Sequence, residues 1–200
     1  MKIKTLRRTK TTSIVVANEE YWGILPDKIL HFYSKGQSEQ FEISIENAEK
    51  LLDDIKKTAW EKLLDFLAYR ERSYSECESF LMQRILFKKD LQNKMLQKAI
   101  SLNFINDERF AEMLTDDLIR KGKSEAVIRN KLYSKNIRED IISKVIIEKY
   151  DGKTKNEILQ ANIKKAKKKY GGSQKANEKI LNFLTRQGFS YWEVKEIMGD

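Results

Sequence analysis

A repeat of 51 to 52 residues constrains the fold of this chain more than any other feature of its sequence. One spacing of apolar residues, in steps of four, five and five, occurs three times without gaps. A period of this length predicts tandem copies of one helical unit, each burying its apolar face against its neighbours. The three sets are Cys77, Leu81, Leu86 and Leu91; Ile128, Leu132, Ile137 and Ile142; and Ile180, Leu184, Phe189 and Val194.

The spacing also predicts what each unit contains. Residues four apart lie on the same face of a helix, and the step of five then crosses a short turn into a second helix. Each unit has room for a further helix before this pair. We therefore predict three three-helix repeats, at residues 47–104, 105–150 and 151–200.

Capping residues indicate where the middle helix of each repeat begins. Ser73 and Glu76 form the serine-x-x-glutamate pattern of a capping box, and Ser124 follows a glycine break. In the third repeat Ser173 follows two glycines. The first helices are then predicted at 47–71, 107–121 and 154–170, and the third helices at 88–102, 138–150 and 190–198.

Residues 1–46 have a different pattern from the rest of the chain. Short bursts of apolar and β-branched residues at 14–16, 21–25, 29–33 and 41–45 are separated by turn-forming residues. They predict an antiparallel module of three or four strands, with His31 in one of them. Since so small a sheet is barely stable alone, we expect it to pack on the helix that follows. The predicted fold class is mostly α with a small N-terminal β module.

The charge of the chain favours anionic partners without choosing among them. The 39 Lys and Arg residues exceed the 30 Asp and Glu residues, for a formal net charge of +9. Nucleic acid, acidic protein surfaces and anionic lipid all suit this sign, and so does a solvated surface with no partner. The excess is densest at 151–200, with 11 basic residues against 6 acidic ones.

Several classes of protein are disfavoured by what the sequence lacks. A single cysteine, Cys77, and a single histidine, His31, exclude a disulfide and leave no thiolate or histidine cluster for a metal, so no cofactor is expected. No catalytic motif is present, and the carboxylates show no spacing that singles out an acid–base pair, so we do not expect an enzyme. The basic N-terminus has no apolar segment after it, and no apolar run could span a bilayer, which predicts a cytoplasmic protein without a membrane partner.

The segments AYRERSYSE at residues 68–76 and FINDERFA at residues 104–111 resemble segments of the RecX family, whose members are regulatory proteins that modulate RecA. Residues 68–76, AYRERSYSE, are similar to the arginine-x-arginine-serine-x-x-glutamate opening of these proteins. Residues 104–111, FINDERFA, resemble their most recognisable segment, and IRKGKS at 119–124 and the helix with Ile128-Arg129-x-x-Leu132 follow it. The likeness covers residues 59–150 well and both flanks more loosely.

The resemblance implies both a shape and an activity. In this family the tandem repeats form an elongated, curved array that lodges in the groove of the RecA–DNA filament. Its usual effect is inhibition of strand exchange, ATP hydrolysis and co-protease activity, in homologous recombination, DNA repair and the SOS response. The implied protein is a monomer whose partner is the RecA filament, with possible DNA contacts to phosphates that ignore sequence.

One departure from the family concerns the ends of the middle helices. Family members place glycine there, whereas this chain has Ile85, Asn136 and Gly188 at the equivalent positions. Asparagine tolerates the left-handed conformation of a helix C-cap, but a β-branched isoleucine does not. The first repeat is therefore expected to end its middle helix differently.

The candidate residues for binding RecA or DNA are basic and lie at three places. At the first place a structural role stays open, such as pairing of Arg70 with Glu71 or Glu76, and at the second place a structural role stays open as well. At the second place we expect no acidic partner next to the cations before Glu125. The lysine run at the third place is either simply solvated or faces an anionic partner. The candidates are Arg70 and Arg72; Lys121, Lys123, Arg129 and Lys131; and Lys164, Lys165, Lys167, Lys168 and Lys169.

Two other functions compete with modulation of a filament. The first is direct, nonspecific DNA binding by a helix-turn-helix protein, and it differs in that binding would not need RecA. The second is an unrecognised nuclease, which would need clustered carboxylates for metal. Aromatic residues do not decide the matter, because they fall at helical core spacing and are expected to pack in the interior: Trp60, Phe66, Phe80, Phe110, Phe183 and Trp192.

Overall fold

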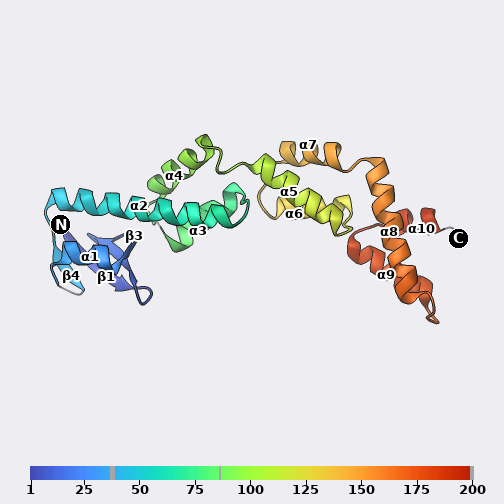
Figure 1. Cartoon of the computed structure of the whole chain (residues 1–200), viewed down its shortest axis with the longest axis horizontal. Coiled ribbons are helices and arrows are strands. Elements are labelled where there is room, and N and C mark those ends of the chain that lie inside the picture. Colours follow the sequence, from blue (N-terminus) through green and yellow to red (C-terminus); the bar gives the residue numbers. More distant parts are fainter. Residues whose placement is uncertain (37–38, 86, 199–200) are drawn as a thin grey trace. The chain divides into compact units, whose positions relative to one another are not determined.

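The computed structural model of this chain describes residues 1–36, 39–85 and 87–198 (Figure 1). They form two units, Met1–Asn106 and Asp107–Asp200, each with its own hydrophobic core. The first unit contains an antiparallel sheet and four helices, and the second contains six helices. The predicted fold class, mostly α with a small N-terminal antiparallel module, is confirmed. Leu86, one of the repeat positions, lies outside the described residues.

The N-terminal sheet has four strands in the order β3-β2-β1-β4. The strands are β1 (Lys2–Arg7), β2 (Thr12–Ala17), β3 (Glu20–Pro26) and β4 (Gln40–Glu42). The sequence did not predict β1, although this strand lies inside the sheet and pairs with both β2 and β4. Its buried residues, Ile3 and Thr5, alternate with exposed lysines. The segment therefore lacks the run of apolar residues by which the other strands were predicted.

The burst at 29–33 is not a strand, and this prediction was wrong. These residues belong to α1 (Asp27–Ser34), so His31 lies in a helix. The buried residues of α1, Leu30 and Ser34, are four apart, and Phe32 is 81% exposed, as helical rather than strand periodicity requires. Asp27 in the first turn suits the positive end of the helix dipole. A short apolar run cannot be assigned to strand or helix by periodicity alone.

Helix α2 joins the sheet to the first repeat. It runs over 25 residues, Ile45–Tyr69, and packs on β3 through Leu51, Ile55 and Leu63, which belong to the same core cluster as Trp22. The other helices of this repeat are α3 (Tyr74–Arg84) and α4 (Lys89–Ser101). The sheet therefore packs on the helix that follows it, as expected.

The second unit contains the other two repeats. Its helices are α5 (Asp107–Arg120), α6 (Glu125–Tyr133), α7 (Glu139–Lys149), α8 (Gly152–Tyr170), α9 (Ala176–Gln187) and α10 (Tyr191–Met198). The repeat positions Ile128, Leu132, Ile180 and Leu184 are all buried in one core. The first and third helices of every repeat lie within two residues of their predicted bounds.

The beginnings of two middle helices are capped as predicted. The hydroxyl of Ser73 accepts a hydrogen bond from the Glu76 amide, and the hydroxyl of Ser124 accepts one from the Val127 amide. In the third repeat the prediction was wrong, because α9 begins after Lys175 and not at Ser173. The residue equivalent to the two capping serines is Ala176, whose side chain has no acceptor.

The ends of the middle helices confirm the expected difference among the repeats. Asn136 has φ +56° and Gly188 has φ +94°, both left-handed, whereas Ile85 has φ −128°. After α3 the chain instead bonds to the edge strand β3. The Ile24 amide donates to the Ile85 carbonyl at 3.0 Å, and the Phe87 amide donates to the Trp22 carbonyl at 3.2 Å. These bonds satisfy a sheet edge that would otherwise be open.

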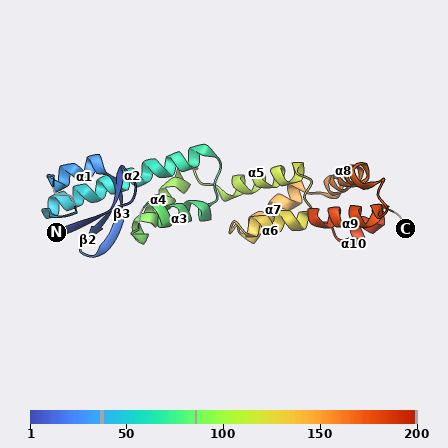
Figure 2. The same cartoon turned by 90° about the horizontal axis from the view of Figure 1, so that it is seen from below.

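Backbone and side-chain hydrogen bonds join the second and third repeats, among them one from the Ser124 amide to the Gln187 carbonyl at 3.0 Å. The hydroxyl of Ser124 donates to the Gly188 carbonyl at 2.7 Å, so the start of α6 meets the end of α9, and Figure 2 shows these helices end to end. The buried Asn162 amide of α8 donates to the Gly122 carbonyl at 2.9 Å, in the turn before α6. The negative end of α9 thus faces the positive end of α6, which is a favourable alignment of dipoles.

We predict that Gly188→Ala lowers the stability of the chain through this joint. A Cβ at Gly188 would overlap Val127 Cγ2 and Ser124 Oγ, in addition to the left-handed strain. The expected loss in the free energy of unfolding is about 2–4 kcal/mol. Gly36→Ala is the matched control, because φ is +88° there and nothing lies within 4 Å of the added atom. Its expected loss is about 1 kcal/mol. Equal losses in urea denaturation followed by circular dichroism would contradict the prediction.

Candidate anion-binding surfaces

Arg70 is held by acidic and backbone oxygens of the first repeat. It caps the C-terminal end of α2, and both of its terminal nitrogens lie 3.0 Å from carboxylate oxygens of Glu76. It also donates to the Glu71 carbonyl at 2.7 Å. The bidentate geometry favours a structural role, fixing the turn between α2 and α3.

Arg72 packs against an aromatic wall beside the same turn. Its Nε donates to the Phe66 carbonyl at 3.3 Å, and its guanidinium lies 4.0 Å from the centroid of the Phe66 ring. Phe66 in turn stacks on Phe80, with 4.2 Å between ring centroids. Burial, together with the nearby positive charge of Arg70, lowers the pKa of Arg72 below its usual value. Arg72 therefore has one cation–π contact and no ion pair among the described residues, although the charge of Glu76 partly offsets the lowering of its pKa.

The candidates near the second junction divide into paired and unpaired cations. Lys121 pairs with Asp117 at 2.6 Å, so the expectation that no acidic partner precedes Glu125 was wrong. Arg129 lies 2.8 Å from Glu125 and 3.4 Å from Glu139, and the hydrogen bond to Glu125 raises the pKa of its guanidinium. The half-buried Lys123 and the exposed Lys131 have no ion pair with an acidic residue of the described ranges.

The five lysines at the end of α8 form the densest unpaired charge of the second unit, and we call them the α8 lysine surface. All five are exposed, whereas Ala166 among them is buried in the core. None pairs with an acidic residue in the part of the chain that the structure describes. Three of them lie in the last turn of α8, where positive charge complements the helix dipole. They are Lys164, Lys165, Lys167, Lys168 and Lys169.

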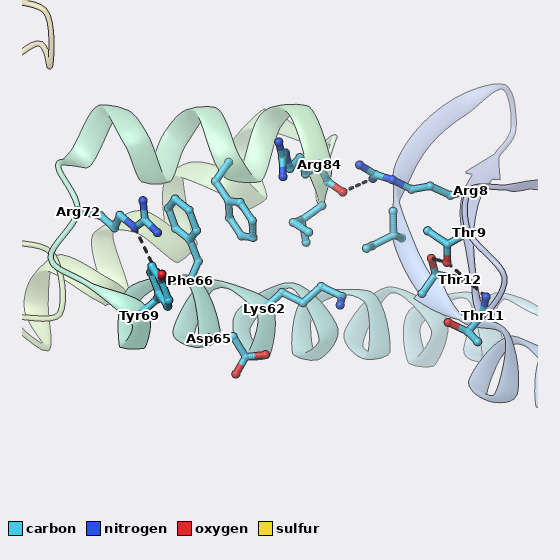
Figure 3. Close-up of a pocket in the computed structure, with 13 residues that line it drawn as sticks. Arg8, Thr9, Thr11, Thr12, Lys62, Asp65, Phe66, Tyr69, Arg72 and Arg84 are labelled. Carbon is cyan, nitrogen blue, oxygen red and sulfur yellow. Dashed lines mark hydrogen bonds between the residues drawn. The ribbon is translucent and has the colours of Figure 1, made fainter.

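A second set of cations in the first unit was missed by the sequence analysis. A groove with a volume of 640 Å³ lies between the β1–β2 turn, α2 and α3, and we call it the basic groove (Figure 3). Its cations are Arg8, Lys62, Arg72 and Arg84, of which only Arg72 was a candidate. The other three are far apart in the sequence, and no local pattern connects them. Only the packing of the sheet beside α2 and α3 brings them together.

The structure also corrects one expectation about the aromatic residues. Trp192 of α10 is 74% exposed and lies against Tyr191, with ring centroids 5.5 Å apart, so it is not part of the interior. Phe110 is buried, and the remaining four aromatic residues of that set are partly buried. Among the described residues, no group of three acidic, histidine or cysteine side chains is arranged to hold a metal ion. No described helix has the length and apolar character needed to cross a membrane.

Tandem three-helix units after an antiparallel sheet, with two unpaired basic surfaces, define a basic helical-repeat protein. The family model described as RecX, second three-helix domain, matches residues 106–146, which contain α5, α6 and most of α7. The Regulatory protein RecX of Lactococcus lactis subsp. cremoris strain MG1363 is 26% identical over 193 residues, covering 94% of this chain and 71% of that protein. That of Streptococcus agalactiae serotype V is 28% identical over 213 residues, covering 99% and 76%.

Solved structures agree with these relatives. The crystal structure of RecX from Lactobacillus salivarius is 26% identical, covers 73% of this chain and 96% of that chain, and superposes with a TM-score of 0.63. A second crystal structure of a regulatory protein RecX is 19% identical, covers 97% and 99%, and has a TM-score of 0.61, which shows a shared fold. The chain is thus similar to RecX proteins over most of its length.

We predict that paired and unpaired cations of this chain differ in their effect on stability. Arg129→Gln removes hydrogen bonds to Glu125 and Glu139, and we expect it to lower the free energy of unfolding by about 1 kcal/mol. The control replaces Lys164, Lys165 and Lys168 of the α8 lysine surface together by Gln. It should leave stability unchanged or raise it slightly, because it relieves repulsion between like charges. Urea denaturation of both variants tests this, and a larger loss in the lysine variant would contradict it.

Proposed function

We propose that this chain binds the RecA nucleoprotein filament and inhibits its ATP hydrolysis, strand exchange and co-protease activity. Similarity to proteins named RecX over most of the chain is the observation that carries the proposal. The relatives are named regulatory proteins, which supports a role in controlling another protein rather than catalysis. The process is DNA repair and homologous recombination, together with the SOS response that the co-protease activity serves.

The repeat architecture suggests how such inhibition would work. A filament presents the same surface many times, and three tandem repeats can each engage one of its successive protomers. Weak contacts then add through multivalency, because each bound repeat holds the next one close to its site. A molecule bound across neighbouring protomers would hinder their movements during ATP hydrolysis and block the entry of a second DNA.

Further details of this proposal follow the same family resemblance. The acting species is a cytoplasmic monomer that needs no cofactor, and its working parts are residues 1–46, 47–104, 105–150 and 151–200. Contacts to DNA, where the filament exposes it, would be to phosphates and indifferent to sequence, since a lysine ammonium is a point charge without the planar fork that reads a base edge. The α8 lysine surface supplies such contacts.

The alternative function is direct nonspecific DNA binding without RecA. The unpaired lysines of α8 favour it. The middle helices do not suit base reading, because Arg129 is held by Glu125 and Glu139, and Arg186 donates back to the Asn182 carbonyl at 3.2 Å. Any direct binding by these helices would therefore be driven by phosphates.

We predict that the purified chain inhibits the single-stranded-DNA-dependent ATPase of RecA at about one molecule per ten RecA protomers, since each bound molecule affects several protomers. The control is DNA binding by the chain alone across a salt series under the same conditions. Inhibition at concentrations where free DNA is not yet bound supports filament modulation. Inhibition that begins only when the chain coats the DNA, with a steep salt dependence, would contradict it and favour the alternative.

A further inference from the structure

We propose that the basic groove of the first unit binds single-stranded nucleic acid, with phosphates on its cations and an unpaired base stacked on Tyr69. This inference deepens the alternative function, direct DNA binding without RecA, because it assigns that binding a site and a single-stranded ligand. It rests on three properties of the groove, which are its uncompensated charge, its linear arrangement and its exposed aromatic ring.

The first property is positive charge without acidic partners. Arg8, Lys62, Arg72 and Arg84 line the groove, and Asp65 is its one acidic lining residue. None of the four cations forms an ion pair with an acidic residue in the described ranges. Several cations elsewhere in the chain do form ion pairs, as Arg70 does with Glu76. Like charges gathered without counter-charges favour an anionic ligand.

The second property is the arrangement of the cations along a line. Figure 3 shows Arg72 at one end of the groove and Arg8 at the other, with Arg84 and Lys62 across from each other between them. The guanidinium of Arg8 donates to the Arg84 carbonyl, which holds Arg8 beside the C-terminal end of α3. The two ends are separated by the length of α3, an 11-residue helix of about 16 Å. A compact anion cannot contact both ends, whereas a chain of phosphates can.

The third property is the aromatic surface beside the cations. Tyr69, the last residue of α2, lines the groove and is 85% exposed, so its ring is open to a ligand. Phe66 and Phe80 are stacked on each other and Arg72 covers the Phe66 ring, so these rings form a wall and Tyr69 is the ring left open. Cations that follow a backbone, beside an open ring that accepts a base, are the features of single-strand binding sites.

These features favour a single strand over the other polyanions. In a duplex the bases are paired and stacked on each other, so an exposed ring has no base face to accept. An acidic peptide would use the cations but has no need of the ring. Hydroxyl groups add a further contact, since Thr9, Thr11 and Thr12 line the same end as Arg8 and hydroxyls donate to phosphate oxygens.

The test measures binding of a fluorescent oligothymidylate to the full chain by anisotropy, without RecA and across a salt series. One variant replaces three groove cations, Arg8→Gln, Lys62→Gln and Arg84→Gln, and leaves Arg72 in place because it packs on Phe66. The charge-matched control replaces Lys164, Lys165 and Lys168 of the α8 lysine surface by Gln. A second pair, Tyr69→Ala and Tyr69→Phe, separates stacking from charge.

We expect the groove variant to bind the oligonucleotide at least about tenfold more weakly. The slope of log binding constant against log salt concentration should be smaller in magnitude by about 2, since each of the three lost phosphate contacts removes about 0.7. The α8 control should keep most of the affinity. Tyr69→Ala should weaken binding by about fivefold to a hundredfold at an unchanged salt slope, as expected for one lost stacking contact. Tyr69→Phe should bind like the original chain.

Three results would overturn the inference. The first is that the groove variant binds the oligonucleotide as tightly as the original chain. The second is that a glutamate-rich peptide displaces the labelled oligonucleotide as well as unlabelled oligothymidylate does, and the third is that a DNA duplex displaces it equally well. If circular dichroism shows that the groove variant is unfolded, the exposed Tyr69 pair decides the question alone. Because RecA is absent from this assay, its outcome is independent of the ATPase measurement that tests the proposed function.

Discussion

The structure depends on one constraint, which is that a three-helix unit of about 50 residues cannot bury its apolar face alone and must join a neighbour. In the second unit the joint is made by backbone at the ends of helices. Ser124 both caps α6 and donates to Gly188, where α9 ends, so one side chain fixes a helix start and its link to the next repeat. A larger residue than glycine would separate them, which explains why the left-handed glycine remains at this end.

The first repeat meets the same constraint with a different partner. Its long first helix, α2, covers the sheet and the repeat core together, so the sheet provides the apolar surface that a preceding repeat would otherwise supply. The edge of the sheet then needs hydrogen bonds of its own, and the Ile85 carbonyl and the Phe87 amide provide them. Isoleucine at this position is thus compatible with the repeat, because the backbone at Ile85 bonds to β3 without a left-handed conformation.

Local signals explain what could be predicted from the sequence. Helices of each repeat follow from periodic apolar residues and from caps such as Ser73, whose effect reaches only a few positions along the chain. Strand β1 was missed because its exposed positions are basic, and α1 because a five-residue apolar run suits either structure. Lys121 pairs with Asp117, four residues earlier on the same helix. This pair could have been predicted, because residues four apart on a helix are neighbours. The basic groove could not be predicted at all, since only tertiary packing brings Arg8 to Arg84.

Pairing, and not the number of positive charges, separates structural cations from those available to a partner. The conspicuous arginines of the family-like segments, Arg70 and Arg129, are neutralised by nearby carboxylates and stabilise turns. Groups of cations without ion pairs among the described residues lie instead in the basic groove and on the α8 lysine surface, one in each unit. If both surfaces bind anions as proposed, the chain would contact a long polyanionic assembly at two places, and the combined affinity would exceed that of either contact. Each surface could then be weak and salt-sensitive by itself.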